Sequence, residues 1–142
     1  MEIIDAINYR EIIITLLLCE RLPTEDLPEP LENFRVMIDN DKPVGVVGLE
    51  THGNYGLLRS LVVRPGFRNQ NIAAALIKEI EKLAVSKRLK SIFLLTETAP
   101  DYFLHKGYSR ITRSEVPLDV QQSSEFSHVC PQSAIAMKKD IE

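Results

Sequence analysis

Apolar and polar residues follow two different periods along the chain, and the clearest change between them lies within residues 57–90. Residues 57–63 form a short apolar run that is β-branched at its end, which predicts a buried strand. Pro65 cannot donate a hydrogen bond to a sheet, so strand pairing is expected to end there. Apolar residues then recur at 72, 76, 80, 83 and 84, which predicts an amphipathic helix. The stretch therefore predicts a strand, a polar turn at 68–71 and a long helix.

A tight turn that leads from a strand into a helix has a definite chemistry. The first N–H groups of the helix have no intrahelical partner, and the positive end of the helix dipole points the same way. Such a turn can bind phosphate, and Arg64 and Arg68 lie next to it. The lysine-bearing phosphate loop of nucleotide hydrolases is absent, which argues against that class of enzyme. The alternative is a strand–turn–helix unit that packs and binds nothing.

The remaining pattern predicts an alternation of strands and helices. A helix is expected at 6–21, a Pro-rich acidic loop at 22–33, and a hairpin turn at 39–43. Thr98 followed by Pro100 predicts the start of a short helix, which Gly107 would end. Strands are predicted at 1–5, 34–38, 44–50, 91–96, 108–113 and 133–138, turns at 51–56, and one or two helical turns at 116–126.

Length and composition predict an ordinary globular chain. With 142 residues, 44% hydrophobic and 26% charged, we expect one domain over 1–142 with its own core. The longest apolar run, residues 12–19, is too short to cross a bilayer, so no membrane association is expected. The first residues include Glu2 and Asp5 and lack a basic segment, so we expect no signal peptide and a cytoplasmic location.

Charge, cysteine and histidine content limit the kinds of ligand and partner that we expect. A net charge of −3 argues against nucleic acid, although residues 59–90 hold eight basic side chains against two acidic ones and would suit an anionic cofactor. Cys19 and Cys130 are expected to be reduced core thiols. The three histidines share no ligand spacing, and no metal site is expected.

Two motifs connect this pattern with a known family. The spacing Arg68-x-x-Asn71-x-Ala73, preceded by Leu-Val-Val-Arg-Pro, resembles the acetyl-CoA-binding motif of the GNAT superfamily of N-acetyltransferases. Asn71 stands where that family usually has Gly, and Asn tolerates positive φ best after Gly. Tyr-Phe-Leu-His-Lys-Gly-Tyr at 102–108 resembles a second segment of the family. The resemblance implies an α/β (α+β) acyl-CoA N-acyltransferase fold, with a mixed central sheet of six to seven strands flanked by helices.

Two shorter segments suggest a subgroup. Residues 57–61 and 125–134 are similar to acetyltransferases associated with bacterial arsenic-resistance operons. The Cys-Pro-x-Ser segment at 130–133 also resembles amino-acid acetyltransferases of the glutamate-acetylating kind.

The resemblance implies how acetyl-CoA, the cosubstrate, would bind. It would lie between parallel strands 57–63 and 91–96, which splay apart in this family. Its pantetheine arm would pair with the strand backbone, and a free N–H near residue 61 or 62 would stabilise the oxyanion. The cofactor-binding residues implied are Leu61, Val62, Val63, Arg68, Asn69, Gln70, Asn71, Ile72, Ala73 and Phe103.

Catalysis by direct attack requires a neutral amine. Deprotonation at pH 7 costs roughly 1 kcal/mol for an α-amino group and about 4 to 5 for a lysine-like amine, and the sequence offers no strong base. We therefore expect a weakly basic acceptor, with Glu50 orienting the water that relays the proton. The alternative for Glu50 is a solvated acid at a strand end. Ser60 lies where the acyl end would reach, and Tyr102 is the candidate acid for the CoA thiolate because the family's usual Tyr position holds Phe103.

The acceptor is predicted only by class. Arg59 could clamp a carboxylate or an oxyanion, or else form a structural ion pair, and Glu97 and Thr98 are further candidates for the substrate pocket. The expected enzyme acetylates a small-molecule amine, such as an amino acid or an arsenic-containing analogue. The alternatives are a non-catalytic acetyl-CoA sensor and a protein N-terminal acetyltransferase. Dimers are common in the family, so a homodimer is one expected assembly.

Overall fold

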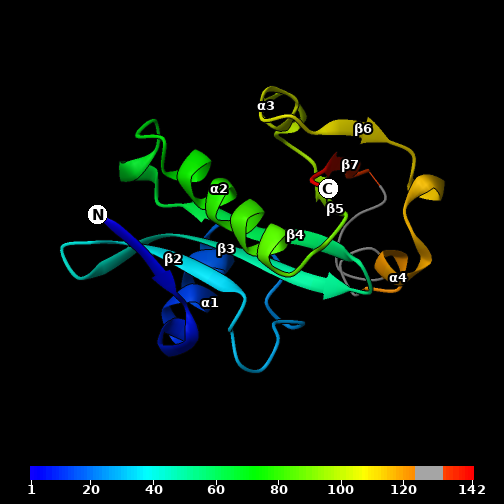
Figure 1. Cartoon of the computed structure of the whole chain (residues 1–142). Helices are drawn as coiled ribbons and strands as arrows, with labels where there is room; N and C mark the ends of the chain where they lie inside the picture. The colour runs from blue at the N-terminus through cyan, green and yellow to red at the C-terminus, as the bar shows by residue number, and fades with distance from the viewer. Residues whose placement is uncertain (124–132) are drawn as a thin grey trace. The chain divides into compact units, whose positions relative to one another are not determined.

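The computed structural model describes residues 1–123 and 133–142 (Figure 1). Within these residues seven strands form a mixed sheet in the order β1-β2-β3-β4-β5-β7-β6. Strands β4 and β5 pair in parallel, whereas β1 with β2, β2 with β3, β5 with β7 and β6 with β7 pair antiparallel. The predicted mixed sheet with accompanying helices is therefore confirmed. The strands are β1 (Glu2–Asp5), β2 (Phe34–Asp39), β3 (Lys42–His52), β4 (Tyr55–Val63), β5 (Ser91–Thr96), β6 (Ser109–Ile111) and β7 (Ile135–Asp140).

Helices separate most of these strands along the chain, whereas β2, β3 and β4 follow one another without a helix between them (Figure 1). None of the helices in the described residues is long and apolar enough to cross a membrane. They are α1 (Arg10–Cys19), α2 (Ile72–Ser86), α3 (Pro100–His105) and α4 (Leu118–Gln121), with short 3-10 turns at Ile7–Tyr9, Pro65–Phe67 and Arg113–Glu115.

The described chain divides into two compact units. The first comprises residues 1–49 and 60–83, and the second comprises residues 50–59 and 84–142. Strands β3 and β4 and helix α2 contribute residues to both units. A single domain over 1–142 stays a prediction.

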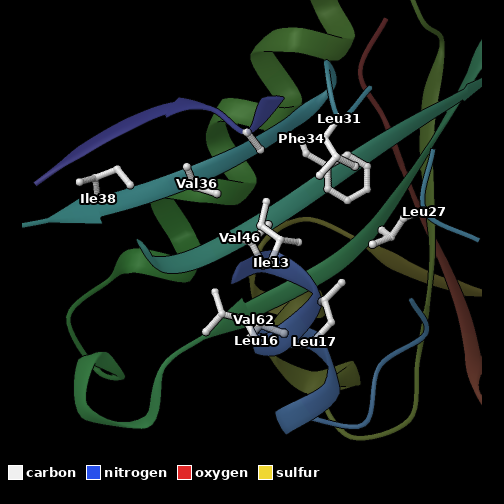
Figure 2. Packing of buried hydrophobic residues seen from close by; sticks show 11 residues of the cluster. Ile13, Leu16, Leu17, Leu27, Leu31, Phe34, Val36, Ile38, Val46 and Val62 are labelled. Carbon is white, nitrogen blue, oxygen red and sulfur yellow. The ribbon is translucent and has the colours of Figure 1, made fainter. Parts of the chain in front are cut away.

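The core of the first unit lies between α1 and the strands (Figure 2). Helix α1 buries Ile13, Leu16 and Leu17 in a cluster that also contains Val46 of β3 and Val62 of β4. Leu16 and Leu17 lie three and four residues after Ile13, so the three side chains share one face of the helix. Ile7 and Leu18, apolar residues within the helix predicted at 6–21, are exposed, so the helical segment buries fewer of its apolar residues than expected.

Gly45 determines how closely α2 approaches β3 in the first unit. A Cβ atom at Gly45 would lie 3.1 Å from Leu76 and 3.2 Å from Ile72, both on α2, and 3.2 Å from the Val62 carbonyl. Any larger residue would therefore push against the first turns of the helix. The absence of a side chain here lets the start of α2 pack directly on the sheet.

The second unit has its own core. Leu57 of β4, Phe93 of β5, Val120 of α4 and Ala136 of β7 form a buried cluster together with Val116. The parallel register of β4 with β5 joins residues 55–57 to residues 91–93. Ser91 of β5 also donates a hydrogen bond of 2.6 Å to the carboxylate of Asp140 on β7.

Several predicted boundaries differ from the structure. The turn expected at 51–56 is only Gly53–Asn54, since β3 continues to His52 and β4 begins at Tyr55. Thr98 does not cap α3: the N-cap is Ala99, whose N–H donates a hydrogen bond to the hydroxyl oxygen of Thr96 at 3.1 Å. The strand expected at 108–113 is reduced to Ser109–Ile111 because a 3-10 turn follows it.

Cys19 also differs from its prediction. It lies at the end of α1 and is exposed, so it is not a core thiol. The apolar face of α1 is centred on Ile13, Leu16 and Leu17, which leaves the helix end outside the core. Cys130 lies outside the described residues.

Candidate functional site

Strand β4 contains one residue with a positive φ, Ser60, at 60°, and this residue is buried. A residue other than Gly rarely adopts positive φ, and within a strand it breaks the extended conformation. Such strained residues are concentrated at functional sites because the surrounding structure must hold them in place. Ser60 therefore marks a local departure from regular strand conformation, immediately before Leu61 to Val63, the residues predicted to contact the cofactor. Val62 is buried, and Leu61 and Val63 are half-buried.

The turn between β4 and α2 belongs to the first unit and has an unusual backbone. After the 3-10 turn at Pro65–Phe67, Asn69 has a φ of 67° and Asn71 a φ of 62°. Asn71 therefore adopts the positive φ that the sequence analysis expects it to tolerate. The N–H of Ala75 is bonded to the Asn71 carbonyl at 3.1 Å, so the N–H groups of Ile72, Ala73 and Ala74 precede the helical ladder. An exposed polar turn thus precedes a helix of fifteen residues whose dipole is positive at this end.

The two arginines beside this turn are tied to neighbouring groups. Arg64 donates from Nε to the Pro43 carbonyl at 2.8 Å. Arg68 donates from Nε to the Val63 carbonyl at 3.2 Å, and its guanidinium forms an ion pair with Glu20, just after α1. Both side chains therefore brace the turn. The donors best placed for an anion are main-chain N–H groups, as the motif predicts for a diphosphate.

We expect Asn71 to tolerate Gly but not Val. At a φ of 62° a β-branched residue is strained, so Asn71→Val should lower the free energy of unfolding by about 1–2 kcal/mol. Asn71→Gly is the matched control, because Gly adopts this φ without a steric cost and should leave stability within about 0.5 kcal/mol. Urea denaturation of the two variants measures the difference. Equal losses in both would mean that the Asn71 side chain, not its backbone conformation, is what matters.

A second group of predicted residues meets in the second unit, around the hairpin between β3 and β4. The Arg59 guanidinium donates to Glu50 Oε2 at 2.5 Å, and Glu50 Oε1 lies 2.9 Å from Nε2 of His52. The side chain of Arg59 is 0% exposed, whereas those of Glu50 and His52 are 19% and 23% exposed. Arg59 therefore forms an ion pair, which was the alternative to its predicted role in substrate binding.

The electrostatics of this cluster determine the state of Glu50. Burial raises the pKa of the Glu50 carboxyl, but hydrogen bonds from His52 and Arg59 and their positive charges lower it further than burial raises it. The net result is a pKa below the usual 4.5. Glu50 is thus a carboxylate at neutral pH and a weak base. It can orient a water molecule, but it has little tendency to keep a proton.

Tyr102 and Phe103 lie on α3 in the second unit. Phe103 is buried and contacts both Tyr102 and Tyr108 edge to face, with ring centroids 5.6 Å apart in each pair. Tyr102 is exposed at its outer side, with Lys106 Nζ 5.4 Å from its ring centroid. Partial burial raises the pKa of Tyr102 above 10.0, which keeps the hydroxyl protonated and able to donate.

The remaining substrate candidates, Glu97 and Thr98, follow the end of β5 and are exposed. The hydroxyl of Ser133 donates to Glu97 at 3.2 Å. Ser133 is the last residue of the predicted Cys-Pro-x-Ser segment, and the three residues before it lie outside the described residues. Residues 1–123 and 133–142 contain no group of three or more His, Cys, Asp or Glu side chains that could hold a metal ion.

The predicted residues therefore fall into two groups. The first unit holds Ser60, Leu61 to Val63 and the turn from Arg68 to Ala73, whereas the second holds Glu50, Arg59, Glu97, Thr98, Tyr102 and Phe103. Sequence reasoning missed His52 as the partner of Glu50. The available signal was its spacing, because residues 50 and 52 point to the same face of a strand.

Comparison with known proteins identifies the family and the fold. Residues 12–110 match the Acetyltransferase (GNAT) family. A search of curated proteins gives no match. Among solved structures, an acetyltransferase of the GNAT family from Staphylococcus aureus Mu50 aligns with a TM-score of 0.79 and 21% identity, over 99% of each chain.

Two further structures contain coenzyme A. Rv2747 from Mycobacterium tuberculosis, in complex with CoA and a second ligand, aligns with a TM-score of 0.80 and 21% identity over 100% of both chains. N-acetylglutamate synthase from Neisseria gonorrhoeae, complexed with coenzyme A and N-acetyl-glutamate, aligns with a TM-score of 0.81 and 15% identity, over 99% of this chain and 35% of that one. These likenesses establish the fold. With the family match over most of the chain, they show that this protein belongs to the GNAT family of acetyltransferases.

Proposed function

We propose that the protein transfers the acetyl group of acetyl-CoA to the amine of a small molecule by direct attack of that amine. The observation that carries this proposal is the turn before α2. Its positive-φ asparagines and the first N–H groups of the helix, which precede the helical hydrogen bonds, are suited to bind an anion, in a chain of an acetyltransferase family. The diphosphate of CoA is the anion that this family would supply. CoA in the complexes of two structural neighbours supports the assignment.

The acyl end of the cosubstrate is assigned to Ser60 and the residues after it. Positive φ at Ser60 departs from the extended conformation of the rest of β4, and this local irregularity supports the assignment. In the proposed complex the pantetheine amides pair with the backbone of Leu61 and Val63, and one N–H near Leu61 or Val62 stabilises the oxyanion. Phe103 stays a predicted cofactor contact.

The proposed acceptor is an α-amino group, in an amino acid or an amino-acid-like toxicant that includes arsenic-containing analogues. An α-amino group needs only roughly 1 kcal/mol to become neutral at pH 7, which suits a site without a strong base. The Cys-Pro-x-Ser segment and the fold similarity to N-acetylglutamate synthase support an amino acid. Recognition of its carboxylate by Arg59 stays a prediction, because here the guanidinium is enclosed and held by Glu50.

The proposed chemistry assigns two proton steps. Glu50 stays ionised and orients the water that receives the amine proton. Tyr102 stays protonated at neutral pH and donates to the departing CoA thiolate. Thiolates leave readily, so the contribution of Tyr102 to the rate should be smaller than that of proton removal.

The test is release of free CoA thiol from acetyl-CoA in the presence of a panel of amines, followed by mass spectrometry of the products. We expect release to depend on an α-amino acid or a close analogue and to yield its N-acetyl derivative. CoA binding without release on any amine would indicate a sensor. Acetylation only of peptide amino termini would indicate a protein acetyltransferase, and either result would overturn the proposal.

A further inference from the structure

One ion pair in the first unit joins the end of α1 to the turn that the proposed function assigns to the diphosphate. The Arg68 guanidinium donates from Nη2 to Oε1 of Glu20, and from Nε to the Val63 carbonyl at 3.2 Å. All three residues belong to the first unit. The side chains of Arg68 and Glu20 are 49% and 36% exposed, so a ligand in solution can reach both members of the pair.

The position of Glu20 is unfavourable for α1 itself. Glu20 is the C-cap of this helix, and its N–H is bonded to the carbonyls of Leu17 and Leu18. A carboxylate at this end lies beside the negative end of the helix dipole. The last turn of α1, which the structure describes in full, contains no basic side chain that would offset it. The positive charge comes instead from Arg68, so the Glu20 carboxylate is held by the turn and not by its own helix.

The same guanidinium is the cation that lies nearest in sequence to the proposed diphosphate site. An arginine fork binds phosphate as well as carboxylate, and a diphosphate carries more charge and more acceptor oxygens than Glu20. The present pair is exposed, so water solvates both charges when it opens and its loss costs little stability. Exchange of Glu20 for a phosphate is therefore favourable. It requires a new partner only at the end of the guanidinium, since Nε can keep its bond to Val63.

From this ion pair we infer that Glu20 competes with the phosphates of CoA for Arg68, so that cosubstrate binding displaces Glu20 and releases the end of α1. The inference rests on the proposed function and adds an autoinhibitory contact to its diphosphate site. The apparent Kd for CoA is the intrinsic Kd divided by the fraction of molecules in which the pair is open. An exposed pair favours its closed form by up to about fivefold, which sets the size of the expected effect.

The first test compares Glu20→Gln with the wild-type protein by isothermal titration calorimetry with CoA. Gln has nearly the shape of Glu but no charge, so Arg68 becomes available and the Kd should fall about fivefold. The matched control is Glu79→Gln on α2, which removes the same charge from another exposed ion pair of the first unit and should change the Kd less than about twofold. An unchanged Kd in Glu20→Gln would overturn the inference. A higher Kd would also overturn it, because Glu20 would then hold Arg68 ready for CoA.

A double-mutant cycle separates exchange of partners from simple repulsion. Arg68→Gln should weaken CoA binding about tenfold, because one charge-assisted bond to phosphate is lost. Adding Glu20→Gln to that variant should bring no further gain, since no pair is left to open. The titrations use about 0.15 M salt, at which charges more than about 8 Å apart are largely screened. A gain that persists without Arg68 would show that Glu20 repels the phosphates directly, and the inference would fail.

Hydrogen exchange measures the release of the helix end without reference to affinity. The N–H of Arg21 is bonded to the Leu18 carbonyl at 3.1 Å, and that of Leu22 to the Leu17 carbonyl at 2.9 Å. Both should exchange faster in protein saturated with CoA than in free protein, and Glu20→Gln without CoA should show the same faster exchange. Slower or unchanged exchange would contradict the inference and leave the proposed function intact. If the wild-type protein binds no CoA, the proposed function fails, and the inference fails with it.

Discussion

Replacing Glu50 with Ala is expected to lower the free energy of unfolding by about 3–5 kcal/mol, the largest effect of any single substitution proposed for this protein. The reason is that Arg59, with which Glu50 forms an ion pair, is enclosed by the protein. The Arg59 side chain is 0% exposed, and the substitution removes the carboxylate that holds it at 2.5 Å. Loss of one member of a buried ion pair is costly because the remaining charge is kept from water. Urea denaturation at pH 7 measures the difference.

The matched control is Glu79→Ala on α2. Glu79 also pairs with a cation, Lys82 at 3.5 Å, but both side chains are exposed. Because exposed pairs contribute little, this variant should lose no more than about 1 kcal/mol. Similar losses in the two variants would show that enclosure of Arg59 does not determine the effect.

The same pair predicts a pH dependence. Since the pKa of Glu50 is lowered in the folded protein, its contribution to stability is full above the ordinary value of 4.5 and is lost as the pH falls through the lower folded value. The stability difference between wild-type protein and Glu50→Gln should therefore be constant from pH 7 to pH 5. It should shrink below pH 4.5. A difference that grows on acidification would contradict the lowered pKa.

The second large effect is expected at Ala73, in the first turn of α2. Ala73→Glu places a negative charge beside the proposed diphosphate site and should weaken CoA binding about 100-fold through repulsion. The same acid suits the positive end of the helix dipole, so thermal stability should be unchanged or slightly higher. Isothermal titration calorimetry with CoA and thermal unfolding give the two quantities.

Ala73→Gln separates charge from size. Its side chain has nearly the shape of Glu but no charge, so most of the affinity for CoA should remain. If Gln and Glu weaken binding equally, a steric clash explains the effect. If neither changes the affinity, the diphosphate does not bind at the start of α2.

Helix ends show how much of the fold could be predicted from the sequence. Helix α3 ends with Gly107 at a φ of 95°, as predicted, and its Tyr108 N–H is bonded to the Phe103 carbonyl. Helices α1 and α2 end with the same hydrogen-bond pattern, but Arg21 and Arg88 occupy the positive-φ position. Gly marks such an end in a sequence and Arg does not. This is why the predicted helix continued beyond Ser86 towards residue 90.

The candidate site likewise combines features that could be predicted from the sequence with features that could not. Period and motif predicted the strand–turn–helix and the need for positive φ at Asn71, because both depend on local sequence. The pairing of Glu50 with Arg59 and His52 depends on a hairpin whose two-residue turn the sequence did not define. Positive φ at Ser60 has no sequence signal, since Ser is ordinary in a strand. It is imposed by the surrounding structure.

The most direct measurement is a crystal structure of the protein soaked with CoA. We predict that the diphosphate will lie within hydrogen-bond distance of main-chain N–H groups between Arg68 and Ala73, with the thiol end directed towards Ser60. A diphosphate bound elsewhere, or crystals that take up no CoA at concentrations that saturate other members of the family, would contradict the proposed cosubstrate site.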